Sequence, residues 1–246
     1  MSLFTILNTI NSDENLPVLD SADVRYLGEF ENNAYGHWLF DDGSASLESR
    51  VGSKVLTAQA ADPTYDTNFL SITGLPNALN TDLLDSASTQ ITLCTVVRFP
   101  VITALTVFSG NLGVSPATGF SPYIGSDGKV YVTSRGTTLG NTQLFVDPVS
   151  ANTWYFLGFS LDLNAASSTV IGKKSGEVQD TLTAAGAYLL ANEPISLGNS
   201  RYTSAVGNNM NFAEFIVFDS ALDSSSLEAV YERSKTRMAS RGITIA

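Results

Sequence analysis

Short apolar runs alternate with clusters of Gly, Asp, Asn, Ser and Pro from about residue 35 to residue 218. This spacing is typical of an antiparallel β-sandwich or barrel, in which strands are short and turns are frequent. The tripeptide SDG at 126–128 lies between two such runs and favours a tight hairpin. We expect strands near 35–40, 54–58, 67–72, 90–99, 104–109, 121–125, 129–134, 142–146, 153–161, 168–173, 178–182, 194–198 and 211–218. The pattern therefore predicts an all-β domain.

Two of these expected strands indicate how the core is built. Side chains alternate between the two faces of a strand, so every second residue points the same way. In ITLCTVVRF one face carries Ile91, Leu93, Val97 and Phe99. In TWYFLGFSL one face carries Tyr155, Leu157, Phe159 and Leu161, with Trp154 and Phe156 opposite. We expect Trp38 and Trp154 to be core residues.

The expected strand at 211–218 is apolar on both faces, which predicts a central strand covered on each side. Alternation places Phe212, Ile216 and Phe218 on one face and Phe215 and Val217 on the other. Glu214 is the one acid in this strand, and we expect it to be structural, bonding a backbone or hydroxyl group near the sheet end.

The residues after this strand predict a helix that covers the sheet edge. Ser225-x-x-Glu228 is a capping-box pattern, with Asp223 close to the expected N-terminus. One stripe carries Leu227, Val230, Tyr231 and Met238. The cations Lys235, Arg237 and Arg241 lie toward the C-terminal end, where the helix dipole favours positive charge. Gly242 is well placed to end the helix.

Residues 1–33 are mixed in pattern and are predicted to form an N-terminal arm that docks to another protein or contacts a second copy. The alternative is a first strand of the main domain. The main domain then spans residues 34–246, a length that is ordinary for one all-β domain.

Charge and cysteine content exclude several classes of function. The net charge is −11, from 13 Lys and Arg against 24 Asp and Glu. Such a chain repels nucleic acids and anionic membrane surfaces, so we expect neither as a partner. Cys94 is the single cysteine, so no intrachain disulfide can form. Without a recognisable signal peptide or apolar span, we expect synthesis in a reducing cytoplasm and no membrane insertion. The protein would then act outside the cell by another route, such as on a virus particle.

Four segments, taken in order, resemble laminin-G-like, concanavalin A-like jelly rolls. They are YGHWLFDDGSASLESRVGSKVLTA (35–58), NTWYFLGFSLDLNAAS (152–167), EPISLGNSRY (193–202) and FAEFIVFDSALDSSSLEAVY (212–231). The resemblance implies a concanavalin A-like antiparallel β-sandwich, a jelly roll, with one C-terminal α-helix. The chain departs from the family pattern at Ala213, where many members carry an acid, and at IGKKSGEV (171–178).

A cysteine-poor member without a signal peptide is most similar to the versions in tailed bacteriophages, which are commonly homotrimeric. This resemblance implies a non-enzymatic tail-fibre component of the virion, synthesised in the bacterial cytoplasm, that adheres to a bacterial surface polysaccharide. Its N-terminal arm would contact other virion proteins. The alternatives are a monomeric carbohydrate-binding module or lectin, and a glycoside hydrolase.

Residues suited to catalysis are few, and we predict no catalytic site. A glycosidase needs two carboxylates flanking the sugar bond. Glu29 and Glu31 form one spaced pair, but they lie in the expected arm and read as a solvated edge. His37 is the single histidine and Cys94 the single cysteine, and both lie within expected strands as packing residues. A zinc site is therefore not expected.

The loop GNSRYTSAVGNN (198–209) is the preferred ligand-binding segment, because it joins two strands and carries an arginine, a tyrosine and several amides. Its candidate ligand-binding residues are Asn199, Arg201, Tyr202, Asn208 and Asn209, and Tyr65 and Tyr123 are further candidates in other loops. No cofactor is expected; the metal that oxygen-rich loops would favour is calcium. Candidate calcium ligands are Asp41, Asp42 and Asp162, and the alternative is that they only form turns.

Overall fold

The computed structural model describes residues 30–163, 167–205 and 207–246. The chain divides into two units, Met1–Phe30 and Glu31–Ala246. Most of the predicted arm, residues 1–29, lies outside the described residues, so its docking role stays a prediction. Residues 31–33 belong with the second unit.

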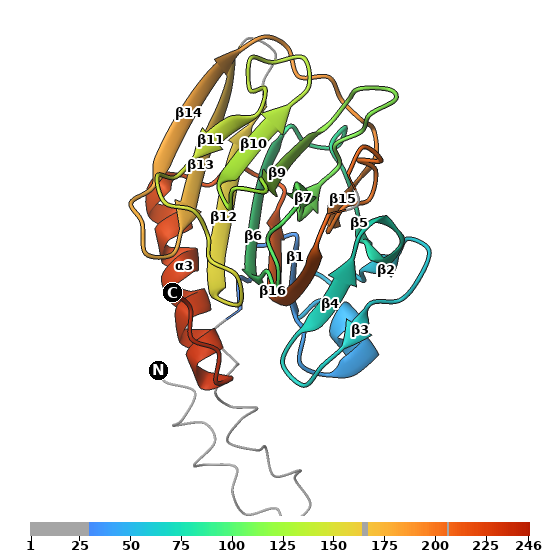
Figure 1. Ribbon diagram of the computed structural model, residues 1–246, viewed down its shortest axis with the longest axis vertical. Coiled ribbons are helices and arrows are strands. Elements are labelled where there is room, and N and C mark those ends of the chain that lie inside the picture. Colours follow the sequence, from blue (N-terminus) through green and yellow to red (C-terminus); the bar gives the residue numbers. More distant parts are fainter. Residues whose placement is uncertain (1–29, 164–166, 206) are drawn as a thin grey trace, which may run out of the picture. The chain divides into compact units, whose positions relative to one another are not determined.

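The second unit is an antiparallel β-sandwich, as predicted (Figure 1). Its larger layer is an eight-stranded sheet with the order β14-β13-β12-β6-β16-β4-β3, and β1 also pairs with β16. These strands are β1 (Gly36–Leu39), β3 (Thr64–Tyr65), β4 (Leu70–Thr73), β6 (Gln90–Arg98), β12 (Trp154–Asp162), β13 (Ser167–Lys174), β14 (Asp180–Ala185) and β16 (Asn209–Phe218). The strand at 211–218 is central, as its apolar faces predicted.

Two four-stranded sheets form the facing layer, with the orders β11-β10-β9-β7 and β2-β5-β15-β8. Their strands are β2 (Thr57–Ala58), β5 (Leu79–Leu84), β7 (Thr106–Val107), β8 (Ser109–Gly110), β9 (Phe120–Ile124), β10 (Val130–Ser134), β11 (Thr142–Leu144) and β15 (Pro194–Leu197). Short 3-10 helices span Gly43–Leu47 and Leu75–Asn77. The sequence did not predict β5, whose Asn80 and Asp82 look like turn residues but alternate with buried Leu79, Thr81 and Leu83.

The core fills the space between these layers. The expected inner faces of β6 and β12 are confirmed: Ile91, Leu93, Val97 and Phe99 are buried there, with Tyr155, Leu157, Phe159 and Leu161. Phe159 packs against Phe108 and Phe145, with ring centroids 5.8 and 6.4 Å away. Burial of so much apolar surface is the main stabilising contribution to a sandwich of this size.

A β-bulge in β16 overturns the predicted faces of that strand. The register against β6 shifts between Phe212 and Glu214, because Phe212 pairs with Val97 and Glu214 with the very next residue, Val96. The extra residue is Ala213, which reverses the alternation after it. Phe212 therefore lies in the core with Phe215 and Val217, while Glu214, Ile216 and Phe218 turn to the other face.

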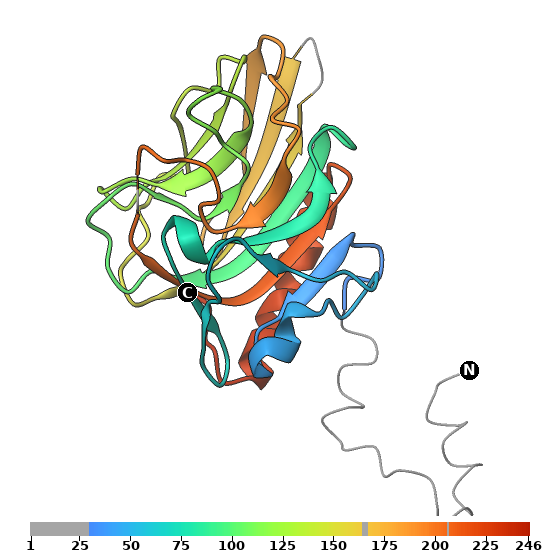
Figure 2. The same ribbon diagram turned by 90° about the vertical axis from the view of Figure 1, so that its right-hand side faces the viewer.

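The predicted helix is α3 (Ser224–Ser240), which lies across the outer face of the large sheet rather than at its edge (Figure 1; Figure 2). Its buried residues include the predicted stripe of Leu227, Val230, Tyr231 and Met238. Tyr231 packs on Phe156 of β12, with ring centroids 5.3 Å apart. A glycine at position 158 makes room for Leu227, since a Cβ there would lie 2.9 Å from Leu227 Cδ1.

Asp223 caps this helix, and the predicted capping box does not form. The Asp223 side chain accepts a hydrogen bond from the Ser226 N–H at 2.7 Å, which satisfies one of the free donors of the first turn. Glu228, the expected partner of Ser225, instead pairs with Lys173 of β13 at 3.0 Å. Gly242 has a φ of +73° and ends the helix as predicted. Among the described residues, no helix combines the length and apolar character needed to cross a membrane.

The prediction that Trp154 is a core residue is wrong, because its side chain lies half-buried on the outer face of the large sheet. Its ring and that of Phe69 pack against the Arg98 guanidinium, with the guanidinium carbon 4.8 and 5.0 Å from the two centroids. Trp38 is fully buried, as expected.

A buried ionic network joins the helix to the sheet beneath it. Arg237, fully buried on α3, donates from Nε to Glu214 Oε1 at 2.7 Å. His37 of β1 lies 2.9 Å from the same oxygen through Nε2. His37 Nδ1 accepts from the Glu31 N–H at 3.2 Å, so the proton of the neutral ring belongs on Nε2. Glu214 is buried within the fold, and it bonds the Arg237 guanidinium and the His37 ring rather than the expected backbone or hydroxyl group.

Glu31 belongs to this network, which overturns its prediction as a solvated residue. Its side chain is buried and accepts two bonds from Arg233, at 2.8 Å from Nε and 2.6 Å from Nη2. Arg237 Nη1 lies 3.3 Å from Glu31 Oε1. Two carboxylates and two guanidiniums therefore balance each other's charge where the second unit begins.

The pKa values follow from this arrangement. Burial alone would raise the pKa of Glu214, but Arg237 and His37 outweigh it and hold this pKa at about 2. Burial lowers the pKa of His37, against the opposing effect of Glu214. At neutral pH, Glu214 is therefore ionised and His37 neutral.

We expect Arg237→Met to lower the free energy of unfolding by about 3–5 kcal/mol, because it leaves Glu214 buried without its main counter-charge. Arg233→Met, on the same helix, is the matched control. It should cost about 1 kcal/mol or less, because Arg233 is partly exposed and Glu31 keeps Arg237. Urea unfolding followed by tryptophan fluorescence measures both values. Equal losses in the two variants would contradict the role given to Arg237.

Stability should fall as the solution is acidified. Glu214 and His37 both have a folded-state pKa below the unfolded-state value, so the unfolded chain binds more protons at low pH. The contribution of His37 is fully present above its unfolded value of about 6.5 and declines below it. That of Glu214 declines from about 4.5 toward 2. Unfolding free energies measured across this range should show a shallower acid limb for Glu214→Gln, and an unchanged limb would contradict the assignment.

Candidate functional site

In the loop that follows β15, Asn199 bonds the backbone of the segment at 199–205. This side chain is buried, and its Nδ2 donates to the carbonyls of Tyr202 and Ala205 at 3.0 and 2.8 Å. Its Oδ1 accepts from the Tyr202 N–H at 2.8 Å. Gln59 adds a bond from Nε2 to the Ser200 carbonyl at 2.8 Å. Asn199, predicted to bind ligand, thus orders the loop that presents Arg201 and Tyr202.

Arg201 lines a small polar pocket at the sheet that contains β5 and β15. The cavity has a volume of about 270 Å3 and is lined by Gln59, Asn80, Glu193, Pro194, Ser200 and Arg201. Arg201 donates from Nη1 to the Asn111 carbonyl at 3.1 Å, and its Nη2 lies 3.7 Å from Glu193 Oε1. The guanidinium is therefore oriented by the protein, beside a carboxylate and two amides that can donate to and accept from ligand hydroxyls.

Three tyrosines, here called the tyrosine patch, are Tyr123 of β9, Tyr131 of β10 and Tyr202 of the loop at 199–205. The rings of Tyr123 and Tyr131 stack at 5.3 Å with an angle of 14° between their planes. Tyr131 donates from its hydroxyl to Asp127 Oδ2 at 2.9 Å. Burial raises the pKa of Tyr123 to about 12, with further contributions from Tyr131, Tyr202 and Asp127.

Tyr123, predicted to bind ligand, is 6% exposed and lies beneath Tyr131. The half-buried rings of Tyr131 and Tyr202 therefore provide the accessible aromatic surface, beside the Asp127 carboxylate. Aromatic rings pack on apolar C–H groups, while phenol hydroxyls and carboxylates exchange hydrogen bonds. A ligand with both apolar C–H faces and many hydroxyl groups is matched by this combination. A saccharide has this chemistry.

The remaining predicted binding residues lie elsewhere. Tyr65 of β3 packs partly buried against the core. Asn208 bonds within the 103–106 segment, through Thr103 Oγ1 at 3.1 Å and the Ala104 carbonyl at 3.3 Å. Asn209 accepts from Thr73 Oγ1 at 2.6 Å on the outer face of the large sheet. Of the predicted binding residues, Arg201 and Tyr202 are thus presented together, on the segment that Asn199 bonds.

Sequence reasoning missed Tyr131, although a signal was present. The SDG hairpin at 126–128 sets a register in which Tyr123 pairs directly with Tyr131. Gln59, Asn80 and Glu193 come from three distant segments, and no local pattern links them.

The candidate metal ligands are dispersed. Asp41 bonds Arg50 at 2.8 Å and lies 3.9 Å from Arg241 Nε, so cations already face it. Asp42 precedes the 3-10 helix Gly43–Leu47. Asp162, at the opposite end of the large sheet, accepts from Gln90 Nε2 at 3.2 Å. No group of three His, Cys, Asp or Glu suited to a metal occurs among the described residues.

Glu29 lies outside the described residues, and the other catalytic candidates weighed from the sequence are enclosed. His37, Glu31 and Glu214 are buried in the network beneath α3. Cys94 is buried as predicted, and burial raises the pKa of its thiol well above the ordinary value. None of these groups faces the Arg201 pocket or the tyrosine patch.

Comparison with solved structures supports the fold. No protein-family model matches the chain, and no curated protein matches it in sequence. A botulinum neurotoxin serotype G binding domain aligns with a TM-score of 0.60 and 10% identity, over 83% of this chain and 52% of that one. A Trypanosoma rangeli sialidase, solved with 2,3-difluorosialic acid, aligns with a TM-score of 0.58 and 12% identity, over 81% and 33%.

The receptor-binding domain of a C/D mosaic botulinum neurotoxin aligns with a TM-score of 0.57 and 11% identity, over 82% of this chain and 52% of that one. The chain thus spans about a third of the sialidase and half of the toxin domains. At this level of identity the likeness concerns architecture, and it agrees with the layers described above: the chain is a jelly-roll-like β-sandwich.

Proposed function

We propose that this domain is a non-catalytic glycan-binding domain, whose ligand contacts the Arg201 pocket and the tyrosine patch. The observation that carries the proposal is the loop locked by Asn199, which presents Arg201 and Tyr202 as consecutive residues. A preformed loop loses little conformational entropy on binding, which favours recognition of a flexible saccharide. The receptor-binding role named for the toxin domains, on the same architecture, supports a binding function.

The carboxylates near the site support binding over hydrolysis. A glycosidase needs an acid and a second carboxylate on opposite sides of one sugar bond. Glu193 lies beside Arg201, and Asp127 is occupied by the Tyr131 hydroxyl and the Lys129 N–H. Glu193 is therefore suited to accept ligand hydroxyl groups, while Asp127 orients the Tyr131 hydroxyl.

The resemblance to phage jelly rolls extends this proposal to a biological setting. The domain would be part of a virion tail fibre, assembled as a homotrimer, with residues 1–33 contacting other virion proteins. Its ligand would be a bacterial surface polysaccharide, and no cofactor would be needed.

Binding should depend on the two presented side chains. We expect Tyr202→Ala and Arg201→Ala each to weaken affinity for a bound surface polysaccharide by about tenfold, because each removes a ring or charge-assisted contact. Arg50→Ala, which removes a partly exposed arginine paired with Asp41, is the matched control. Titration calorimetry on polysaccharides selected by glycan array measures the affinities, with EDTA leaving them unchanged. Retained binding in both site variants would contradict the proposal.

The same polysaccharides should stay intact, so no new reducing ends are expected after prolonged incubation. The protein should also be a trimer, so light scattering should give three times the chain mass. Reducing ends that vanish on Glu193→Gln would instead establish a glycoside hydrolase. A clean monomer that still binds glycan would favour the carbohydrate-binding module over the tail fibre.

A further inference from the structure

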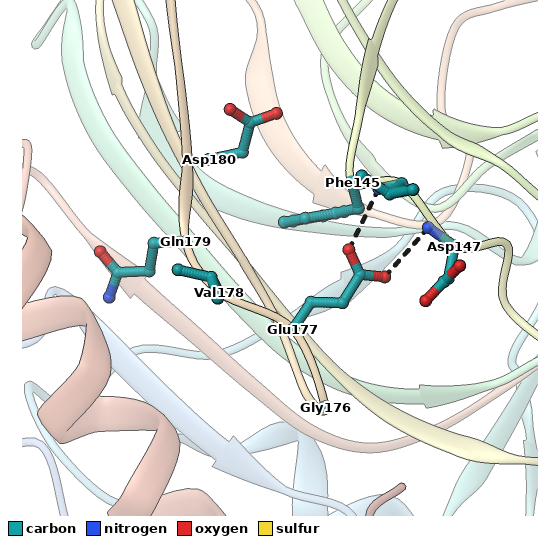
Figure 3. A pocket seen from close by; sticks show the side chains of 8 residues that line it. Phe145, Asp147, Gly176, Glu177, Val178, Gln179 and Asp180 are labelled. Atoms are coloured by element: carbon teal, nitrogen blue, oxygen red, sulfur yellow. Dashed lines mark hydrogen bonds between the residues drawn. The ribbon is translucent and has the colours of Figure 1, made fainter.

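A second cavity lies between the segment after β11 and the hairpin that joins β13 to β14 (Figure 3). Its volume is about 470 Å3, within the usual range for small-ligand sites. The lining residues are Phe145, Val146, Asp147, Gly176, Glu177, Val178, Gln179 and Asp180. None of them belongs to the Arg201 pocket or to the tyrosine patch.

Two exposed apolar side chains mark this cavity. Val178 is 88% exposed and Val146 is 81% exposed, the highest values among the exposed large hydrophobic residues of the described chain. They come from different loops, yet both line the same cavity. Apolar groups gathered at one recess, and not scattered singly, indicate a contact surface for a ligand.

Glu177 joins the two segments that line the cavity. Its carboxylate accepts from the backbone N–H groups of Val146 and Asp147 at 3.1 and 3.2 Å, as Figure 3 shows. Phe145 has a φ of +63°, a conformation that directs successive N–H groups toward one anion. Lys174 pairs with Glu177 and also donates to the Asp147 carbonyl at 2.7 Å. The two loops are thus tied together before any ligand arrives.

The charge of the cavity rim is negative. Lys174 is bound to Glu177, and Lys173 is bound to Glu228 at 3.0 Å. Within the described part of the chain, no cation pairs with the carboxylates of Asp147 and Asp180, whose places on either side of Phe145 are visible in Figure 3. A ligand that combines positive charge with an apolar face therefore fits this recess.

An extended peptide is the less suitable occupant, because two N–H groups on the neighbouring edge of β14 are already bonded. The Thr181 N–H is already bound by the Asp180 side chain at 2.8 Å. The Ala185 N–H is bound by Thr138 Oγ1 at 3.1 Å. A strand added at this edge would find these donors occupied, which removes the main-chain bonds that such recognition needs.

We propose that this cavity binds a cationic amino-saccharide, with its C–H face on Val146 and Val178 and its ammonium groups at Asp147 and Asp180. This assignment deepens the proposed glycan-binding function and rests on it. It adds a second contact region that selects sugars with free amino groups over their N-acetylated forms.

Glucosamine pentamer and its fully N-acetylated counterpart are the matched probes, at a pH where the free amines are protonated. Calorimetry should give tighter binding for the glucosamine pentamer, weakened about tenfold or more by Asp147→Asn/Asp180→Asn. The control Asp219→Asn/Glu232→Gln makes the same change in net charge away from the cavity lining and should leave affinity unchanged. Val146→Ser/Val178→Ser should also weaken binding, because it removes the apolar surface.

Equal binding of both pentamers, or equal losses in the cavity and control variants, would overturn the inference. The proposed function would then still stand if a surface polysaccharide binds in a Tyr202-dependent manner. If Leu-Lys-Leu amide bound as tightly as the glucosamine pentamer and with the same dependence on Asp147 and Asp180, the cavity would be a peptide site and the saccharide assignment would be wrong.

Discussion

The buried contact between Glu214 and Arg237 is the constraint on which the rest of the structure depends. It joins the central strand of the large sheet to the helix that covers its outer face. Two charges removed from water stabilise a fold only when each satisfies the other, so this pair tolerates one relative position of strand and helix. His37 and Glu31 extend the same constraint to β1 and to the start of the second unit.

The one extra residue of the β-bulge allows Glu214 to reach Arg237. The bulge at Ala213 turns Glu214 toward the helix and Phe212 toward the core. Arg241, just past the helix, donates to the Ala213 carbonyl at 2.9 Å and so holds the bulge from outside. Arg237 and Arg241 were predicted to interact with the helix dipole, but both bond to groups of the sheet. Their positive charges therefore bind the helix to the large sheet.

Local patterns were sufficient for the architecture but not for the bulge or the site. Alternation along β6 and β12 predicted their core faces, because both strands are regular. Strict alternation failed in β16 since a bulge depends on the partner strand, and β5 was missed because its polar residues resemble a turn. The Arg201 pocket joins Gln59, Asn80 and Glu193 across the fold, and only tertiary structure brings such residues together. Tyr202 was a candidate from its loop, and the pairing partner of Tyr131 on β9 would have pointed to this residue through the hairpin register.

The two proposed binding regions are stabilised in the same way. In each, a polar side chain bonds the backbone of a loop: Asn199 orders the loop at 199–205, and Glu177 orders the segment at 145–147. Ordered loops on a sandwich give exposed side chains fixed positions without covering them. This arrangement suits a protein that binds an extended surface through several contacts, since linked contacts raise the overall affinity.

Oxidative footprinting of tyrosines with and without a bound surface polysaccharide tests the central claim most directly. If the glycan lies on the tyrosine patch, Tyr131 and Tyr202 lose reactivity on binding, while Tyr35 and Tyr65, which lie outside it, keep theirs as internal references. Protection confined to Tyr35 or Tyr65, or no protection at saturating glycan, would contradict a binding site at this loop.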